Sequence, residues 1–435
     1  MIELDTAWAV VMVFISLVLF LVSTATLWSQ MHAWRTPETY EGIRFPPPAA
    51  PWLSFSLIMP CREESEAVMT ATLDALLAQD HPDFEVIISV GHDDVDTTAI
   101  AQWLAQRSPG RVKVSINTDL VKNKPRQLNT ALGMCTKQIV GIIDAESLTH
   151  PRLLSGIDTT FVVHDVDIVQ GAVHLMNYRT AWFTLRNCLE YRTWFRSRLH
   201  GHAKAGFIPL GGNTVFIKRD ALDEVGGWDG NCLAEDCEIG VRLSVLGKTT
   251  AVVYDKELIT REEAPGTIGQ LIKQRTRWAL GFMQVLAKND WRGMPTRRGR
   301  FVAWWTLVQQ HAMAFAGVAI PLAVITALFV DMPPAVVLVA FLPAIPTVLT
   351  LAFEVLILHE FGRDMGFRIR TREYVVLILS TPFYQLMLAM SSLRAAWKFF
   401  TGDFSWEKTS HHGLHLPGTL TSPAPVAAAS RDIAA

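Results

Sequence analysis

The chain has 435 residues and a formal net charge of −2; half of its residues are hydrophobic and 18% are charged. A charge so close to neutral excludes a general nucleic-acid-binding protein, which needs a basic surface to release counterions. Soluble domains have roughly 25% charged residues, and the apolar excess here is gathered into a few long uncharged runs, which predicts membrane-embedded segments.

The first predicted element is an uncleaved transmembrane anchor within residues 1–34. Ala7 to Trp28 carries no charge and is long enough to cross a hydrocarbon core of about 30 Å, which takes roughly 20 helical residues. A cleaved signal peptide would begin with basic residues, whereas this chain begins with Glu3 and Asp5. The first basic residue is Arg35, so the positive-inside rule places the N-terminus outside and the following domain in the cytoplasm.

Residues 52–290 change to short apolar strands that alternate with amphipathic helices, after a proline-rich linker at Phe45–Pro51. The predicted strands are Phe55–Met59, Glu85–Val90, Val112–Ile116 and Ile139–Ile143, and the predicted helices are Glu66–Leu77 and Pro125–Cys135. This alternation predicts a mostly parallel sheet covered by helices. In such sheets, ligands bind at the carboxyl ends of the strands.

Acidic residues follow three of the predicted strands. They stand in Pro60–Glu64, in Gly91–Asp96 and in Asp144-Ala145-Glu146. Neighbouring carboxylates repel one another unless a cation compensates, and oxygen ligands beside a substrate phosphate suit Mg²⁺ or Mn²⁺. For Asp93 and Asp96, capping of the following helix is an equally good interpretation. For Asp144 and Glu146, a metal site is favoured.

A basic and aromatic stretch follows in the second half of this domain. We predict a structural helix that faces the membrane, and contact with an acceptor or with lipid headgroups is the alternative. The residues are Trp182, Arg192, Trp194, Arg196, Arg198 and His200.

Gln274, Arg277 and Trp278 fall at positions i, i+3 and i+4, on one face of a predicted helix. Arginine can hold phosphate through its planar fork, and tryptophan offers a flat apolar surface for a sugar ring. The alternative is a helix anchored at the membrane surface by basic and aromatic side chains. Both interpretations can hold, because an apolar run begins at Phe301.

The C-terminal region, residues 301–400, contains three apolar runs. Phe301–Val330 has no charge, and Ala335–Leu358 has only Glu354. The link between them has no Lys or Arg and should lie outside, whereas the next link is rich in arginine and should lie inside.

The third run, Tyr374–Leu393, is long enough to cross, but Arg394 and Lys398 follow it, and Pro382 could break its helix. We therefore predict a re-entrant or interfacial hairpin, with a fourth crossing as the alternative. Residues 417–435 are rich in Ala, Pro and Ser and are predicted to be a disordered tail.

Taken in order, the motifs resemble the membrane-bound family 2 glycosyltransferases with the D, D, D, QxxRW pattern. That group includes cellulose, hyaluronan and poly-N-acetylglucosamine synthases and ceramide glucosyltransferase. The similarity covers about Ser56 to Trp278 and the flanking membrane segments. The motifs are Leu57–Glu64, Lys122–Pro125 with Leu128-Asn129, Asp144–Glu146, Leu210–Asn213, Ala234–Asp236, Gln274–Trp278 and Trp406–Thr409. The resemblance implies a GT-A fold, a Rossmann-like mixed α/β sheet, on the cytoplasmic face of the cell (inner) membrane of a multi-pass protein.

The resemblance also implies residue roles on the donor side. Asp144 and Glu146 resemble the DxD motif that holds Mg²⁺ or Mn²⁺ on the sugar diphosphate, with Glu in place of the second Asp. Lys124 resembles the basic residue near the nucleotide. Asp93, with Asp94 as a close alternative, resembles the aspartate that contacts uracil. Glu63, in the first motif, is counted with these nucleotide-binding residues.

On the acceptor side, Asp236 resembles the general base, with a helix-dipole role as the alternative. Gln274, Arg277 and Trp278 resemble the platform for the acceptor and the diphosphate. A base opposite the leaving group predicts inversion at the sugar carbon.

Three functions follow from this resemblance. The first is an inverting glycosyltransferase that adds sugars from a UDP-sugar to a growing polysaccharide, with a homo-oligomer or an export partner. The second is transfer of a single sugar to a membrane lipid. The third is a catalytically silent membrane scaffold, supported by Gly91-His92-Asp93-Asp94, where the family usually has Asp-Asp-Gly-Ser.

Overall fold

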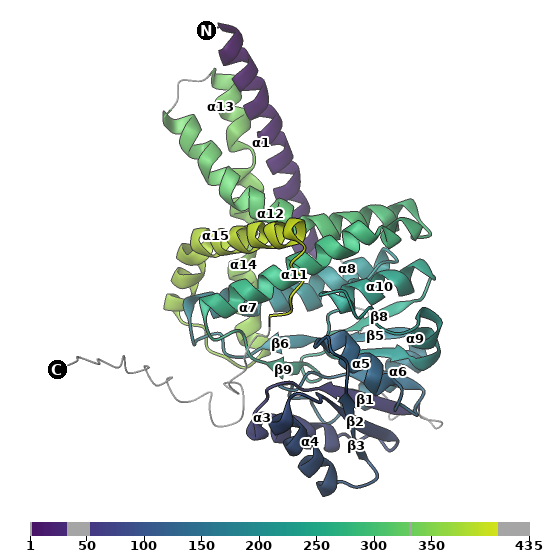
Figure 1. Ribbon diagram of the computed structural model, residues 1–435. Helices are drawn as coiled ribbons and strands as arrows, with labels where there is room; N and C mark the ends of the chain where they lie inside the picture. The colour runs from purple at the N-terminus through teal and green to yellow at the C-terminus, as the bar shows by residue number, and fades with distance from the viewer. Residues whose placement is uncertain (1, 33–52, 330–332, 408–435) are drawn as a thin grey trace, which may run out of the picture.

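The computed structural model describes residues 2–32, 53–329 and 333–407, and it divides into an α/β domain and a set of long helices (Figure 1). The α/β domain lies at one end, and helices α1 and α13 project from the other. The predicted linker at Phe45–Pro51 and the predicted tail at 417–435 lie outside the described residues.

A seven-stranded sheet with the order β3-β2-β1-β4-β7-β5-β8 forms the centre of the α/β domain. Strand β7 runs antiparallel to its neighbours β4 and β5, and the other pairs are parallel, so the predicted mixed sheet is confirmed. The strands are β1 (Phe55–Pro60), β2 (Phe84–Gly91), β3 (Val112–Asn117), β4 (Ile139–Ile142), β5 (Ile168–Gly171), β7 (Val215–Lys218) and β8 (Thr250–Val253). A small second sheet pairs β6 (Val173–Leu175) with β9 (Thr260–Glu262).

Helices bury both faces of the large sheet. Along β1, Leu57 and Met59 point into one apolar cluster and Ile58 into the other, as the two-residue period of a strand requires. Burial on both faces explains why the parallel strands read as continuous apolar runs. The helices of this domain are α3 (Glu66–Leu77), α4 (Val95–Arg107), α5 (Lys124–Leu132), α6 (Leu153–His164), α7 (Trp182–Thr193), α8 (Leu199–Lys204), α9 (Arg219–Val225), α10 (Glu235–Val245) and α11 (Ile268–Lys288), with a π-helical turn η1 (Trp194–Arg198) and a 3-10 turn η2 (Asp290–Gly293).

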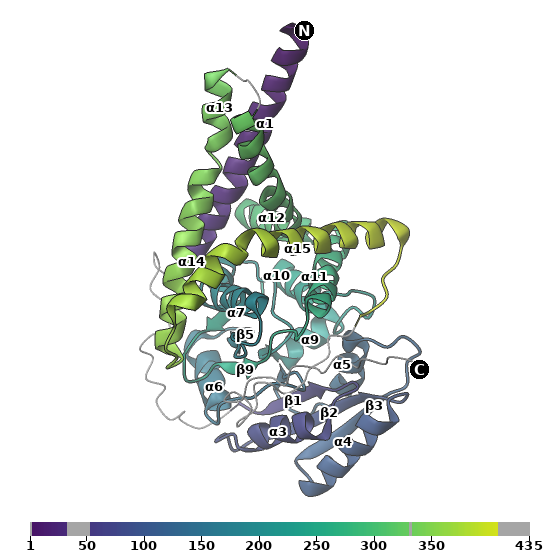
Figure 2. The ribbon, with the colours of Figure 1, turned by 90° about the vertical axis from the view of Figure 1, so that its left-hand side faces the viewer.

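The long helices include four candidate membrane spans among the described residues. They are α1 (Ile2–Gln30), α12 (Arg297–Phe329), α13 (Pro334–Phe341) followed by α14 (Ala344–Asp364), and α15 (Thr371–Thr401). The run Ala335–Leu358, predicted as one crossing, is interrupted by a turn at Leu342-Pro343. Figure 2 shows that α1, α13 and α14 extend in a common direction, whereas α15 lies crosswise over the α/β domain.

The hairpin predicted for Tyr374–Leu393 is wrong, because α15 is one helix of 31 residues with Pro382 inside it. Proline removes the donor to the carbonyl four residues earlier in a helix, here that of Ile378. The carbonyl of Leu377, just over one turn before Pro382, accepts hydrogen bonds from Arg186 Nη2 (2.8 Å) and from Thr381 Oγ1 (3.1 Å). Arg186 comes from α7, so a contact distant in sequence holds this part of α15 against the α/β domain.

Candidate active site

A cavity of about 630 Å³ begins at the carboxyl ends of β1 and β4 and continues between the long helices. Its walls at the sheet include Lys124, Asp144, Glu146 and Asp236, as well as Gln274, Arg277 and Trp278 from α11. Its other walls come from α1, α12, α14 and α15. Residues predicted from four separate stretches of the chain therefore face one cavity.

Lys124 lies close to both Asp144 and Asp236. Its Nζ donates to Asp144 Oδ1 at 2.5 Å and to the carbonyl of Gly212 at 2.7 Å. Asn123 caps the start of α5 by accepting from the N–H of Arg126 (3.2 Å), which fixes Lys124 at the first helical position. Burial lowers the pKa of Lys124, but the charges of Asp144, Glu235 and Asp236 outweigh burial and raise it.

Asp144 follows β4 directly, and a buried polar group holds its backbone. The N–H of Asp144 donates to Asn213 Oδ1 at 3.0 Å. Asn213 Nδ2 in turn donates to Ser147 Oγ at 2.7 Å and to the carboxylate of Glu262. Burial, together with the charges of Glu146 and Asp144, raises the pKa of Glu262 well above its usual range. Glu262 was not predicted from the sequence, because nothing in its local pattern shows that β9 brings it behind Asp144 and Glu146.

The crowded carboxylates fit a divalent cation. Among the described residues, no three His, Cys, Asp or Glu side chains converge with the geometry of a complete metal site. Mg²⁺ and ions of similar preference need only one or two protein carboxylates when substrate phosphates supply the other oxygens. Asp144 and Glu146, both on the cavity wall, satisfy that requirement.

Asp236 is the second residue of α10, and two backbone donors fix its carboxylate. The N–H of Gly212 donates to Oδ2 and the N–H of Cys237 to Oδ1, each at 2.7 Å. A Cβ atom at position 212 would lie 2.9 Å from Asp236 Oδ2 and 3.5 Å from Lys124 Nζ, so glycine permits this close approach. The neighbouring Glu235 is buried, and burial together with the charge of Asp236 raises its pKa to about 7.

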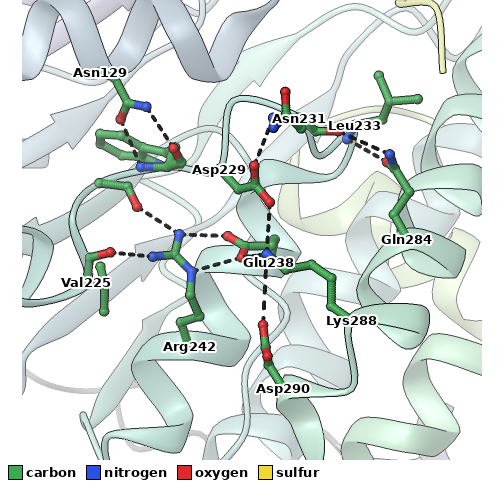
Figure 3. A network of polar contacts seen from close by, with 12 residues as sticks. Asn129, Val225, Asp229, Asn231, Leu233, Glu238, Arg242, Gln284, Lys288 and Asp290 are labelled. Atoms are coloured by element: carbon green, nitrogen blue, oxygen red, sulfur yellow. Dashed lines mark hydrogen bonds and ion pairs between the residues drawn. The ribbon is translucent and has the colours of Figure 1, made fainter.

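A network of ion pairs ties α10 to α11 (Figure 3). The buried carboxylate of Glu238 accepts from Arg242 Nη2 at 2.7 Å and pairs with Lys288, at the end of α11. Lys288 also pairs with Asp229 at 2.8 Å, and Gln284 of α11 accepts from the N–H of Leu233 at 2.9 Å. These contacts fix the helix that carries Asp236 relative to the helix that carries Gln274, Arg277 and Trp278.

The three predicted residues of α11 share the face that lines the cavity. The Oε1 of Gln274 is buried and accepts no hydrogen bond from the described residues. Arg277 Nη1 donates to the carbonyl of Glu407 at 3.0 Å. The guanidinium of Arg275 lies 4.6 Å from the ring centroid of Trp278. The platform is thus one amphipathic helix face that carries an amide, a cation and an aromatic ring.

Three other predicted nucleotide-binding residues, Glu63, Asp93 and Asp94, are not on the cavity wall. Asp93 pairs with Arg62 (2.9 Å) and with Lys122 (2.8 Å), and of these two partners Arg62 lines the cavity. The hydrogen bond from Arg62 holds the pKa of Asp93 well below its usual range. Asp94 caps α4 by accepting from the N–H of Thr97 (3.3 Å), and it also accepts from the N–H of Glu63 (2.5 Å). Their assignment to the nucleotide stays a prediction.

Comparison with known proteins supports the same family. A model described as "Glycosyltransferase like family 2" matches residues 51–281. The poly-beta-1,6-N-acetyl-D-glucosamine synthase of Staphylococcus epidermidis is 24% identical over 278 residues, which are 63% of this chain and 65% of that protein. The beta-monoglucosyldiacylglycerol synthase of Nostoc sp. is 26% identical over 384 residues, 83% of this chain and 77% of that protein. The match thus spans somewhat less than two thirds of the staphylococcal relative's length.

A solved structure shows the same fold. The mannosyltransferase PcManGT from Pyrobaculum calidifontis, solved in complex with GDP-Man and Mn²⁺, superposes with a TM-score of 0.59 at 19% identity, over 88% of this chain and 99% of that one. This likeness confirms the GT-A fold that the motifs implied. Because the family model covers more than half of the sequence, the chain belongs to the family 2 glycosyltransferases.

Proposed function

We propose that this chain is an inverting glycosyltransferase that transfers a sugar from a UDP-sugar to a growing polysaccharide and forms a β-linkage. One observation carries the proposal: Asp144 and Asp236 face the same cavity, with Lys124 close to both, beside the platform of α11. The staphylococcal relative, a polysaccharide synthase by name, supports the choice of product.

A divalent ion, Mg²⁺ or Mn²⁺, fits beside Asp144 and Glu146. When bound there, it would neutralise the charge that develops on the departing nucleoside diphosphate. Lys124 and Arg277 both line the cavity and add fixed positive charge for the same purpose.

Asp236 is the proposed base. The N–H groups of Gly212 and Cys237 each hold one of its carboxylate oxygens and orient the group toward the cavity. The carboxylate removes the proton of the acceptor hydroxyl, whose oxygen then bonds to the sugar carbon as the bond to the diphosphate breaks. Attack on the face opposite the leaving group inverts that carbon.

We place the protein in the cell membrane as a multi-pass protein with a cytoplasmic catalytic domain. In this arrangement α1, α12 and the α13–α14 pair cross, and α15 lies in the membrane surface. The crosswise course of α15 supports this (Figure 2). Its outward side is a continuous apolar stripe, formed by Val375, Ile378, Leu379, Phe383, Leu386, Met390, Leu393, Trp397 and Phe400, as expected of an interfacial helix.

Transfer of a single sugar to a membrane lipid is the second candidate. Two observations favour it: the cavity continues between α1, α12 and α14, and the Nostoc relative, a glycolipid synthase by name, matches a larger share of the chain. Product length separates the two candidates, because a ladder of glycans supports the polymer and a single-sugar lipid opposes it. The silent scaffold is the least supported, since the site carboxylates share one cavity.

The test uses the purified full chain in detergent with a panel of UDP- and GDP-sugars. We expect turnover of a UDP-sugar with Mg²⁺ or Mn²⁺, loss of turnover in EDTA, and recovery when the metal is added back. Turnover that is unchanged by EDTA would refute the metal site. Absence of both turnover and nucleotide-sugar binding across the panel would refute the transferase and favour the scaffold.

A further inference from the structure

Arg198, the last residue of η1, differs from the other arginines around it. Arg192 Nη2 pairs with Asp364 at 2.5 Å, and Arg196 Nη1 pairs with Glu360 at 3.1 Å. The Nε of Arg198 is buried and has no acceptor, and no hydrogen bond or ion pair joins its guanidinium to any other described residue. Arg198 nevertheless lines the cavity.

The nearest carboxylates do not compensate this charge. Glu190 and Glu354 act on Arg198 only through longer-range attraction, and each already has its own arginine. Glu190 pairs with Arg275, and Glu354 pairs with Arg186 at 3.1 Å. These five side chains therefore leave one surplus positive charge at the cavity wall. Arg198 is half-buried with its Nε covered, and a cation in that position without a counter-charge is costly, which indicates that an anion belongs there.

The surroundings of Arg198 offer further polar partners. The Oε1 of Gln30 and the Oγ1 of Thr350 are also buried without a hydrogen-bond partner among the described residues, and both line the cavity. Ser197, the neighbour of Arg198, donates to the carbonyls of Ser29 and Gln30, each at 3.0 Å, which places the end of α1 beside Arg198. Thr350 stands one turn before Glu354 on α14.

The position of this group indicates a lipid. Gln30 is the last residue of the candidate span Ala9–Gln30, so Arg198 lies level with the end of an apolar helix, where lipid headgroups meet water. Beyond it, the cavity wall is apolar, with Val22 of α1, Ile320 of α12 and Ile357 of α14. A ligand with a phosphate at Arg198 and a hydrocarbon chain along these residues would satisfy both parts of the wall.

We propose that Arg198 binds the phosphate group of a lipid acceptor, which reaches the catalytic carboxylates through the same cavity. Arginine suits this role because it stays charged and presents a fork of donors to phosphate oxygens. The hydroxyl of Thr350, on the same cavity wall, is a further donor for the phosphate. That the lipid is the sugar acceptor rests on the second candidate function, transfer to a membrane lipid, whereas the phosphate site rests only on the contacts described above.

The test measures binding of farnesyl phosphate to the full chain in detergent, without any nucleotide-sugar. We expect wild-type protein to bind farnesyl phosphate at least tenfold more tightly than farnesol, as a charge-assisted phosphate contact implies. Arg198→Gln should lose that preference, and Arg198→Lys should keep part of it. Arg363→Gln, which removes an exposed arginine near the same membrane surface, is the matched control and should keep the preference in full.

Four outcomes would overturn the proposal. The first is equal affinity of wild type for farnesol and farnesyl phosphate, and the second is an unchanged preference in Arg198→Gln. The third is competition by inorganic phosphate at the concentration of farnesyl phosphate, and the fourth is displacement by phosphatidylglycerol at that concentration. The third outcome would indicate a free-phosphate site, and the fourth a bulk-lipid site. If Arg198→Gln fails to fold, the wild-type comparison and Arg198→Lys still decide. Binding that depends on Arg198 without turnover of any nucleotide-sugar would refute the proposed function and leave the phosphate site standing.

Discussion

Asp236 accepts from the N–H of Gly212, and Lys124 donates to the carbonyl of the same residue. This arrangement keeps a base and a cation close without a direct hydrogen bond between them. We expect Asp236→Asn to lower transfer by about 10²–10⁴-fold, the usual contribution of a general base, and to leave nucleotide-sugar binding nearly unchanged. Radiolabelled sugar transfer and calorimetric binding check both parts, and full activity in the variant would remove Asp236 from the mechanism.

Glu235 makes the free energy of unfolding of the protein depend on pH. Its pKa of about 7 in the folded protein lies above the ordinary value of 4.5. Between these values the folded state holds a proton that the unfolded state has lost, so the free energy of unfolding falls as the pH rises from 4.5 to 7.

Glu235→Gln should flatten that dependence. Melting temperatures at pH 5 and pH 7.5 measure the effect, and Glu257→Gln, an exposed glutamate on the same domain, is the control. A slope identical to that of wild type would show that Glu235 does not carry the dependence.

The sequence predicts some site residues well and others poorly, for physical reasons. Asp144, Glu146 and Asp236 belong to short motifs that follow strands or open helices, so their meeting at one edge of the sheet can be inferred. Glu262 has no such local context, and its role behind Asn213 depends on the pairing of β6 with β9.

At the scale of elements, the ion-pair network between α10 and α11 fixes the position of Asp236 relative to the cavity residues of α11 (Figure 3). Glu238→Gln would leave Arg242 and Lys288 without their buried carboxylate, and we expect a loss of roughly 2–4 kcal/mol in the free energy of unfolding. Thermal unfolding in detergent measures the loss. Glu224→Gln breaks a surface pair with Lys248 instead and should cost less than about 1 kcal/mol. Equal costs for both variants would contradict the structural role of the network.

The elements themselves could be predicted where a local pattern dominates. The helix Glu66–Leu77 has the predicted bounds, and the helix predicted to end at Cys135 ends at Leu132, before Gly133. The course of α15 could not be predicted, because the contacts that hold it against the α/β domain include Arg186, almost 200 residues earlier in the chain. The turn at Leu342-Pro343 was also missed, since the apolar pattern is continuous across it.

At the scale of the whole molecule, the crosswise course of α15 predicts that the end of this helix, at Thr401, lies on the cytoplasmic side of the membrane. The five native cysteines are buried, so introduced cysteines can be labelled with little background. A membrane-impermeant thiol reagent added to intact cells should label Pro333→Cys, between α12 and α13, and spare Thr401→Cys, at the end of α15. Glu257→Cys, in the catalytic domain, is the control for the protected side. Labelling of Thr401→Cys from outside would show that α15 crosses the membrane.

The position of β7 in the sheet has a consequence for synthesis. Strand β4 ends at Ile142, but β7, which covers its free edge, begins only at Val215. At about 5–20 residues per second, the ribosome needs several seconds to make the intervening chain. During that interval the nascent sheet presents an unpaired apolar strand, a template for association with other chains. We therefore expect chains truncated between these two strands to aggregate or to bind chaperones more strongly than chains that extend past β8.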